Sequence, residues 1–288
     1  MSDFLVIDLL APIRLSEYVH TAFPSLLSKS MGKKYVKRGL VNINGRVGKT
    51  SDWVDNGMKL AINQPPQSKV SKHSRSLTIL WEDDHLAVIV KPAGINVSGN
   101  RASIVNSMSA NLAQSAQEDA MIHYLPVHRL DRDTKGLLLI AKTRIAHLKL
   151  SAALSNYEIK KVYNVLSVGS FDEKTGKIES DVDGKKAFTS YEVIEQVHSQ
   201  RFGTLSLLKV SIATGRTHQI RIHLSSIGHP ILGDRLHNND IHLDVGKGLF
   251  LYATGLSFIH PKDGYLIEVK MELPPKVNRM MRFESMIR

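Results

Sequence analysis

The chain has 288 residues, of which 42% are hydrophobic and 23% charged, so it can bury one large core or two modest ones and is not disordered throughout. No stretch reaches the roughly 18 consecutive apolar residues of a membrane span, and Asp3 and Asp8 lie where a secretory signal would carry basic residues. Cysteine is absent, which excludes disulfides, thiolate zinc sites and a cysteine nucleophile, and we expect a cytoplasmic protein.

The positive charge is concentrated near the N-terminus. The chain has 38 Lys and Arg against 27 Asp and Glu, a formal net charge of +11. The first 75 residues contain 12 basic and 5 acidic residues, so this quarter carries +7 of that excess. A polyanion binds such a surface by releasing counterions from its phosphates. Charge therefore favours a nucleic-acid partner over a basic surface that serves solubility alone.

A short helix and a hairpin are predicted within the first 62 residues. Apolar residues recur every four positions, which predicts a helix over 14–23. These residues are Leu15, Val19 and Phe23. Asn44-Gly45, between short apolar runs, predicts a tight hairpin turn.

A second, strongly basic helix is predicted over 28–38. Ser28 or Ser30 would cap its start, and Gly39 would end it. Like charges on one helix face repel each other, and a bound phosphate backbone would relieve that repulsion. The basic residues of this helix are therefore the RNA-binding candidates: Lys29, Lys33, Lys34, Lys37 and Arg38. The alternative is a solvated basic helix with no ligand.

The order helix, basic helix, glycine and a strand ending in V-N-x-N-G resembles the RNA-binding module named after small-subunit ribosomal protein four. The resemblance covers 13–62. The sequence NQPPQSKVSKHSRS follows, with the Pro and Ser content of a linker. We therefore predict a small basic RNA-binding domain over 1–63, a linker over 64–76 and a larger second domain over 77–288.

The larger segment is predicted to be rich in strands. Thr143 is expected to cap a helix that reaches Asn156, with Ile145, Leu148 and Ala152 facing inward. Few other helices separate the predicted strands, so the sequence indicates an α+β fold with a mostly antiparallel mixed sheet and a small N-terminal α/β domain. The predicted strands are 77–81, 86–90, 136–142, 162–169, 188–195 and 204–212.

A dense polar loop, P-V-H-R-L-D-R-D-T-K-G over 126–136, precedes one of these strands. It places Asp131 and Asp133 among Arg129, Arg132 and Lys135. A nearby guanidinium keeps a carboxylate ionised, which suits a nucleophile or a base better than a general acid. The alternative is a purely structural turn, in which the Asp side chain bonds to its own backbone and is also held by a local ion pair.

A second polar cluster lies over 214–234. If a helix begins near Thr217, Ile220, Leu224 and Ile227 form its apolar face, and His218 and Arg221 share another. Arg216 would stand at its start. Several donors without an acid suit the binding of an anion.

A metal site in this cluster is the competing interpretation. Its ligands would be His218, His223, His229 and Asp234. Helical zinc pairs are four residues apart, whereas His218 and His223 are five apart and diverge. We expect these histidines to form hydrogen bonds in the core instead.

Tyr163 follows Lys160 and Lys161 early in a predicted strand. Such a tyrosine is usually a core residue, but beside a site its ring could stack on a base.

Together these segments resemble the RluA-type pseudouridine synthases over 77–273. That resemblance implies an isomerase that converts uridine to pseudouridine in structured RNA, without cofactor or metal, after the nucleotide is flipped out of its helix. The motifs that carry it are KPAG, HRLDRDTKG, KKVYNVLSVG, TGRTHQIRIHLSSIGHPILGD and LYATGLSFIHP.

The resemblance also implies roles for individual residues. Asp131 is the catalytic carboxylate, Arg221 the partner that pairs with it, Tyr163 the stacking ring and Arg129 the group associated with flipping. Substrate-binding candidates are His128, Arg216 and His218. Asp131 would either attack the anomeric carbon or remove the adjacent ribose proton to give a glycal, and the sequence leaves both open. The expected partner is RNA, ribosomal rather than transfer RNA, and the expected state is a monomer.

Three positions depart from the family pattern. Lys135 stands where a small Ser is usual, N-V-S-G-N over 96–100 replaces the commoner V-H-P, and Tyr252 takes a place often held by His. Lys135 keeps a second hypothesis open, a catalytically silent RNA-binding or ribosome-assembly protein. A third hypothesis is a metal-dependent RNA hydrolase that uses the histidines.

Overall fold

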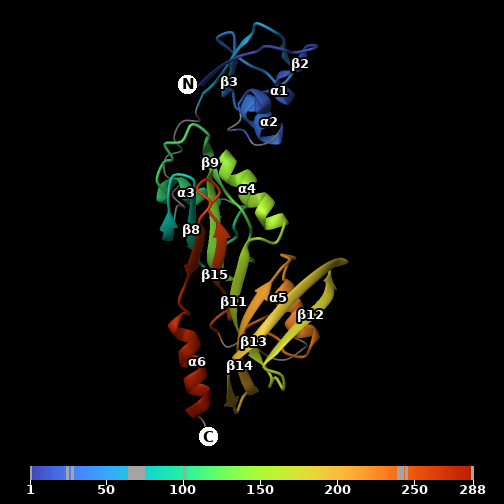
Figure 1. The fold of residues 1–288 in the computed structure, drawn as a ribbon, viewed down its shortest axis with the longest axis vertical. Helices are drawn as coiled ribbons and strands as arrows, with labels where there is room; N and C mark the ends of the chain where they lie inside the picture. The colour runs from blue at the N-terminus through green and yellow to red at the C-terminus, as the bar shows by residue number, and fades with distance from the viewer. Residues whose placement is uncertain are drawn as a thin grey trace.

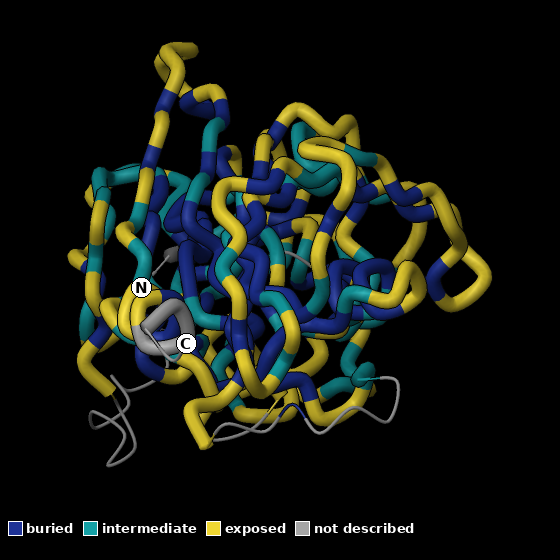
Figure 2. The backbone as a smooth tube through the Cα atoms, turned by 90° about the horizontal axis from the view of Figure 1, so that it is seen from below, coloured by how far each residue is buried: buried dark blue, intermediate teal, exposed yellow. Residues whose placement is uncertain are grey.

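The computed structural model describes residues 2–23, 26, 29–63, 75–99, 102–238, 243 and 246–286. The N-terminal elements and the C-terminal helix lie at opposite ends of an elongated molecule (Figure 1). Buried backbone runs through the interior and exposed backbone surrounds it (Figure 2). No helix in these ranges is long and apolar enough to cross a membrane. The N-terminal elements are β1 Ser2–Leu5, β2 Ile13–Arg14, α1 Leu15–Ala22, α2 Lys29–Lys37, β3 Val41–Ile43, β4 Arg46–Val47, β5 Trp53–Val54 and β6 Lys59–Ile62.

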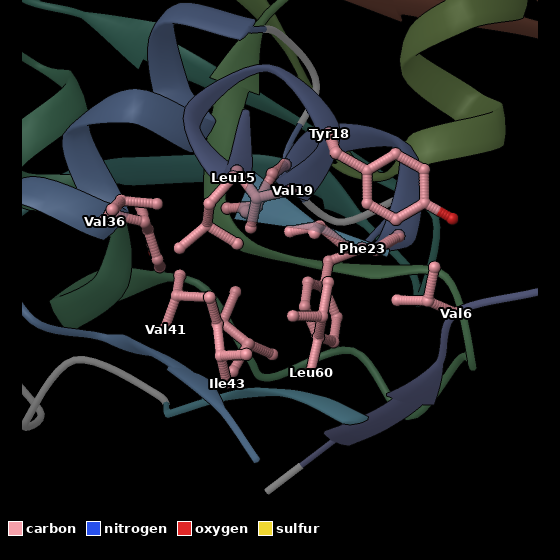
Figure 3. Close-up of a cluster of buried hydrophobic side chains, with 14 residues drawn as sticks. Val6, Leu15, Tyr18, Val19, Phe23, Val36, Val41, Ile43 and Leu60 are labelled. Atoms are coloured by element: carbon pink, nitrogen blue, oxygen red, sulfur yellow. The ribbon is translucent and has the colours of Figure 1, made fainter. Parts of the chain in front are cut away.

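The predicted first helix is confirmed as α1, and its apolar residues enter a core of their own. Leu15, Val19 and Phe23 are buried against residues of β3 and β6 (Figure 3). The sheet order is β1-β6-β3-β4, and β2 pairs with β5. Asn44 and Gly45 both have positive φ, 46° and 84°, as a two-residue hairpin turn requires. The predicted turn is therefore confirmed.

The basic helix α2 is also confirmed, and its end is the predicted one. Gly39 has a φ of +69°, a left-handed conformation that glycine adopts without strain. Ser30 lies inside the helix and does not cap it, whereas Ser28 lies outside the described residues. Tyr35 and Val36 are buried. The five basic candidates are all exposed: Lys29, Lys33, Lys34, Lys37 and Arg38.

The larger part of the molecule is built on a sheet of ten strands, counted over the described ranges. Eight of them follow the order β12-β13-β14-β11-β15-β10-β8-β7, while β9 pairs with β10 and β16 pairs with β15. Its pairs are antiparallel except β10 with β15. The predicted mostly antiparallel α+β fold is thus confirmed. The strands are β7 Thr78–Glu82, β8 Leu86–Lys91, β9 Ala120–Pro126, β10 Lys135–Thr143, β11 Lys160–Val168, β12 Thr175–Val182, β13 Lys185–Ser199, β14 Gly203–Ile212, β15 Leu251–Ile259 and β16 Leu266–Lys270.

Helices lie on both faces of the middle of this sheet. Alternate residues of a strand point to opposite faces. Accordingly Leu251 packs in a cluster with α5, and Tyr252 packs in another with α6. The helices are α3 Val105–Asn111, α4 Arg144–Ser155, α5 Gln219–Ser226 and α6 Pro275–Met286.

The helix after β10 begins and ends as predicted, but its buried face is different. The Thr143 hydroxyl accepts the N–H of Ala146 at 3.3 Å, which confirms the cap. Ile145 and Leu148, predicted to face inward, are more than half exposed, and Ala152 is exposed as well. Ala146 and Leu150 are buried instead, because the crossing of α4 over the sheet sets which stripe faces the core.

The N-terminal elements touch the large sheet through β9. Ile122 packs against the N-terminal core, and the ring of His123 meets the ring of Tyr35 edge-on at 6.4 Å between centroids. Most of the predicted linker, 64–74, lies outside the described residues. The domain boundaries at 63 and 77 therefore stay a prediction.

Candidate active site

A cavity of about 420 Å³ opens where the polar loop before β10, the start of β11, the segment leading into α5, and β15 converge. A cavity of this size accommodates a small molecule or one nucleotide unit. Six of the predicted site residues line it together: His128, Arg129, Asp131, Tyr163, Arg216 and Arg221.

The polar loop is held against β15 by a close backbone approach. The N–H of Thr134 donates to the carbonyl oxygen of Asp131 at 3.2 Å, which closes a tight turn. Gly136 has a φ of +145°, and a Cβ there would collide with the carbonyl oxygen of Ala253. Only glycine fits this position, so the parallel pairing with β15 fixes where Asp131 lies.

Lys91 anchors the same loop from behind, a role that sequence reasoning missed. Its ammonium is fully buried and donates to the carbonyl oxygens of Pro92, Ile95 and Arg132 at 2.9, 2.8 and 3.0 Å. Burial lowers the pKa of Lys91 to about 8, although the charges of Asp133 and Asp131 oppose this shift. The K-P-A-G motif was the available signal, but the sequence alone did not indicate that its lysine reaches across to residue 132.

Asp131 and Tyr163 both line the cavity, close enough for the Asp131 charge to act on the Tyr163 hydroxyl. The Asp131 carboxylate is half-buried and accepts no hydrogen bond from any residue that the structure describes. Burial, followed by the negative charge of Asp131, raises the pKa of Tyr163, so its hydroxyl keeps its proton. The arrangement leaves an unengaged carboxylate beside a flat buried ring.

Arg221 does not pair with Asp131, contrary to what the resemblance implied. Its Nε donates to Asp234 Oδ2 at 2.7 Å and its Nη2 to Asp234 Oδ1 at 2.6 Å. The Asp234 side chain is fully buried and also accepts the N–H groups of Leu236 and His237. A buried carboxylate needs a cation, and Arg221 is the guanidinium on the buried side of α5. Arg221 still lines the cavity that Asp131 lines.

The helix of the second cluster is α5, and it begins later than predicted. His218 precedes it with a left-handed φ of 56° and contacts His237, Nδ1 to Nε2, at 3.1 Å. His218 is not among the cavity-lining residues, although its partner His237 lies within reach of the Asp131 charge, so its role in substrate binding stays a prediction. Ile220 and Leu224 are buried as predicted, whereas Ile227 is 39% exposed because the helix ends at Ser226.

Gln219 is a second residue that sequence reasoning missed. Its amide oxygen accepts from the Thr214 hydroxyl at 2.7 Å and from the N–H of Arg216 at 3.1 Å. Its amide nitrogen donates to Phe188 and Thr189 of β13. Gln219 thus fastens the cavity wall over 214–216 to the sheet.

The histidines of the metal interpretation have other partners. His223 is fully buried, with Nδ1 at 2.9 Å from the Thr189 hydroxyl and Nε2 at 3.1 Å from the Ser180 carbonyl oxygen, as expected of a hydrogen-bonded core histidine. His229 stacks on Phe171 with 3.9 Å between ring centroids. The described residues contain no group of three or more His, Asp or Glu placed to hold a metal ion.

His128 lines the cavity as an uncharged ring. Burial, followed by the charge of Lys161, lowers its pKa to about 4. Its Nε2 accepts the N–H of Leu139 at 3.2 Å, so the ring helps to hold the loop on β10. Because it is neutral near pH 7, it cannot supply a positive charge to an anion.

Lys135, the unusual residue of the loop, is not in the cavity lining. It pairs in register with Tyr252 of β15, which packs toward α6. Burial, followed by the charge of Lys135, lowers the pKa of Lys276 of α6, whose ammonium lies over the Phe250 ring at 4.7 Å. The feature that favoured a catalytically silent protein is therefore absent from the site.

Comparisons with known proteins identify the family of the chain. Residues 85–226 match the profile of the RNA pseudouridylate synthase family. The chain is 32% identical to a protein described as an uncharacterized RNA pseudouridine synthase of Aquifex aeolicus, covering 91% of this chain and 90% of that one. It is 31% identical to the ribosomal large subunit pseudouridine synthase D of Pseudomonas aeruginosa, covering 91% and 88%.

The fold has solved counterparts. The human RNA pseudouridylate synthase domain containing 4 aligns with a TM-score of 0.58 at 22% identity, over 71% of this chain and 92% of the other. This similarity supports the architecture of the large sheet.

Proposed function

Because the chain belongs to the RluA-type family of RNA pseudouridine synthases, we propose that it isomerises specific uridines of structured ribosomal RNA and that Asp131 is its catalytic carboxylate. The observation that carries this proposal is the half-buried Asp131 carboxylate, without a partner among the described residues, beside the buried ring of Tyr163. A carboxylate that no donor engages keeps its nucleophilicity and its basicity.

The uracil must leave its ribose, turn and rejoin through carbon five. Inside an RNA helix these atoms are out of reach, so the nucleotide is flipped out at a cost of a few kcal/mol. Arg129 is exposed at the edge of the cavity. There it can occupy the gap that the flipped nucleotide leaves in the RNA helix, or bind a phosphate. Tyr163 then holds the ring while Asp131 attacks the anomeric carbon or removes the adjacent ribose proton.

Arg221 has a different role from the one first expected. It gives Nε and Nη2 to Asp234, which leaves Nη1 for the substrate or for Asp131. Its anchored guanidinium is a rigid positive wall of the cavity, and preorganised charge of this kind stabilises developing negative charge.

Ribosomal RNA is the substrate class that we infer. Several relatives are named as ribosomal large subunit pseudouridine synthases, among them the Pseudomonas protein and one of Nitrosomonas europaea that is 30% identical over 97% of this chain. The exposed basic face of α2 supports binding to an RNA backbone, in the manner of the ribosomal-type module that 13–62 resembles.

The test uses RNA labelled with tritium at uracil carbon five, because isomerisation releases that hydrogen. Asp131→Asn should abolish release while RNA binding persists, and Asp133→Asn, an exposed neighbour in the same loop, should release tritium like the wild type. Normal release by Asp131→Asn would show that another group performs the reaction. Mapping pseudouridines in total RNA with and without the protein would identify the RNA and the position.

A further inference from the structure

Lys161 places an ammonium group inside the cavity. It lies in β11 two residues before Tyr163, and both residues are buried, at 7% and 6% exposure. Residues two apart in a strand point to the same face. Both line the cavity, and Nζ of Lys161 lies 3.8 Å from the position that a Cβ on Gly215 would take.

This ammonium has no partner among the described residues, neither a hydrogen-bond acceptor nor a carboxylate. The other buried lysines are fully engaged. Lys91 donates to three carbonyl oxygens, and Lys142 contacts Glu82 Oε1 at 2.8 Å and the carbonyl oxygen of Asp83 at 2.6 Å. A buried charge without a partner is costly, so such a group is expected where a ligand completes it.

The surroundings of Lys161 support this interpretation. Burial alone lowers its pKa, with no contribution from a carboxylate. Its neighbour His128 is uncharged near pH 7, and Gly215 offers no side chain. The partner must therefore arrive with the substrate and carry negative charge or electronegative oxygens.

We propose that Lys161 is a further catalytic residue, whose ammonium binds the flipped uracil and stabilises the negative charge that the ring carries once its bond to ribose breaks. The proposal rests on the proposed function of the cavity. The base is favoured over a phosphate because Lys161 lies deep in the cavity on the face that carries Tyr163, whereas the exposed cation at the edge is Arg129.

The charge balance of the reaction explains the need for this cation. When Asp131 bonds to the anomeric carbon, or removes the adjacent proton on the glycal route, the bond from that carbon to N1 breaks and its electron pair leaves with the uracil. The resulting anion spreads its charge over N1 and the two carbonyl oxygens. Carbon five then bonds to the anomeric carbon, and Asp131 is released on the first route or returns its proton to the ribose on the glycal route. Finally the hydrogen on carbon five leaves as a proton, and N1 takes up a proton. Lys161 keeps its own proton throughout and contributes only electrostatically.

The first experiment compares Lys161→Met with Lys160→Met, since Lys160 is the exposed neighbour in the same strand. The probe is ribosomal RNA labelled with tritium at uracil carbon five, taken from cells that lack this protein. In single turnover we expect Lys161→Met to release tritium about 100-fold or more slowly, the scale of losing one preorganised donor. Its Kd for the RNA should stay within about twofold, and Lys161→Arg should recover part of the rate because it keeps the charge.

A second experiment asks whether Lys161 acts on the uracil. Fluorine at carbon five makes the ring a better leaving anion, which therefore needs the ammonium less. With RNA containing 5-fluorouridine, the deficit of Lys161→Met, measured as loss of 5-fluorouridine in one turnover, should shrink about tenfold relative to unmodified RNA. An equal deficit on both RNAs would overturn the proposal. Weaker RNA binding with an unchanged rate at saturation would overturn it as well, because that result would indicate that Lys161 binds a phosphate.

The two proposals fail in different ways. If the wild type released no tritium from any RNA, the proposed function would be wrong. If the wild type were active, Asp131→Asn inactive and Lys161→Met as fast as Lys160→Met, only the role of Lys161 would be wrong. Circular dichroism melting checks folding, and should Lys161→Met not fold, Lys161→Gln removes the charge while keeping a polar group.

Discussion

Arg221 and Asp234 form a buried two-point ion pair, with donor–acceptor distances of 2.7 and 2.6 Å. The pair joins α5 to the turn that follows Ile231, and the same carboxylate caps the N–H groups of Leu236 and His237. The pair thus fixes the N-terminal turn of α5, the helix that supplies part of the cavity wall. The pair stabilises the geometry of the site even though it is not the catalytic pair.

Asp234→Ala should destabilise the protein strongly. The change leaves the buried Arg221 charge without its partner, which typically costs roughly 3–5 kcal/mol. Urea unfolding followed by circular dichroism measures the free energy of unfolding. Glu192→Ala is the control, because the pair of Glu192 with Lys209 is half exposed at 3.4 Å and its loss should change stability by less than about 1 kcal/mol. Equal stabilities of the two variants would contradict the importance of the buried pair.

Gly136→Ala should disrupt the catalytic loop. Its φ of +145° is nearly restricted to glycine, and the new Cβ would collide with backbone atoms of Ala253. We expect the free energy of unfolding to fall by at least about 3 kcal/mol, together with most of the activity. Gly264→Ala is the matched control, since Gly264 has a φ of +75° with nothing within 4 Å, and it should cost only roughly 1–2 kcal/mol. Thermal unfolding and tritium release measure both effects, and wild-type values for Gly136→Ala would show that the loop is not held by its close approach to β15.

Lys91→Met should loosen the catalytic loop and change how stability depends on pH. Three carbonyl oxygens lose their donor, so we expect lower activity and a free energy of unfolding that is about 1–3 kcal/mol smaller near pH 7.

The sign of the pH effect follows from the pKa of Lys91, which is about 8 in the folded protein and roughly 10.4 in an unfolded chain. Between these values the unfolded chain binds more protons, so this lysine makes folding more favourable as pH rises. The free energy of unfolding of the wild type minus that of Lys91→Met should therefore increase from pH 8 to about 10.4 and stay flat from pH 6 to 7. A decrease over the upper range would mean that Lys91 is not a buried cation.

The exposed face of α2 should contribute to RNA binding mainly through charge. Changing Lys33, Lys37 and Arg38 together to Ala should weaken binding and reduce the slope of log K against log salt by roughly one for each RNA phosphate that the variant no longer neutralises. Tyr35 and Val36 are untouched, so the fold should persist. Filter binding at several salt concentrations measures the slope. A triple Ala variant of exposed lysines outside the N-terminal segment, Lys174, Lys262 and Lys270, is the control, and equal slopes in the two variants would remove α2 from the interface.

Short-range patterns in the sequence were enough to predict the local elements and the segments that form the site. The end of α2 at Gly39, the turn at Asn44 and the cap at Thr143 depend on residues within a few positions of each other, so short-range chemistry suffices to place them. The ordered motifs also identified the loop that carries Asp131, because their residue types and order are visible in the chain.

Which side chains meet depends on long-range packing, which local sequence patterns do not reveal. Arg221 takes Asp234 as its partner because a fully buried carboxylate, 13 residues further along the chain, needs the nearest guanidinium. Ile145 lies outside because the packing of α4 on the sheet, and not the helical period alone, selects the buried stripe. Lys91 and Lys161 differ in the same way: each is a buried lysine in a strand, but one is surrounded by carbonyl oxygens and the other by an open cavity, a contrast that arises from segments far apart in sequence.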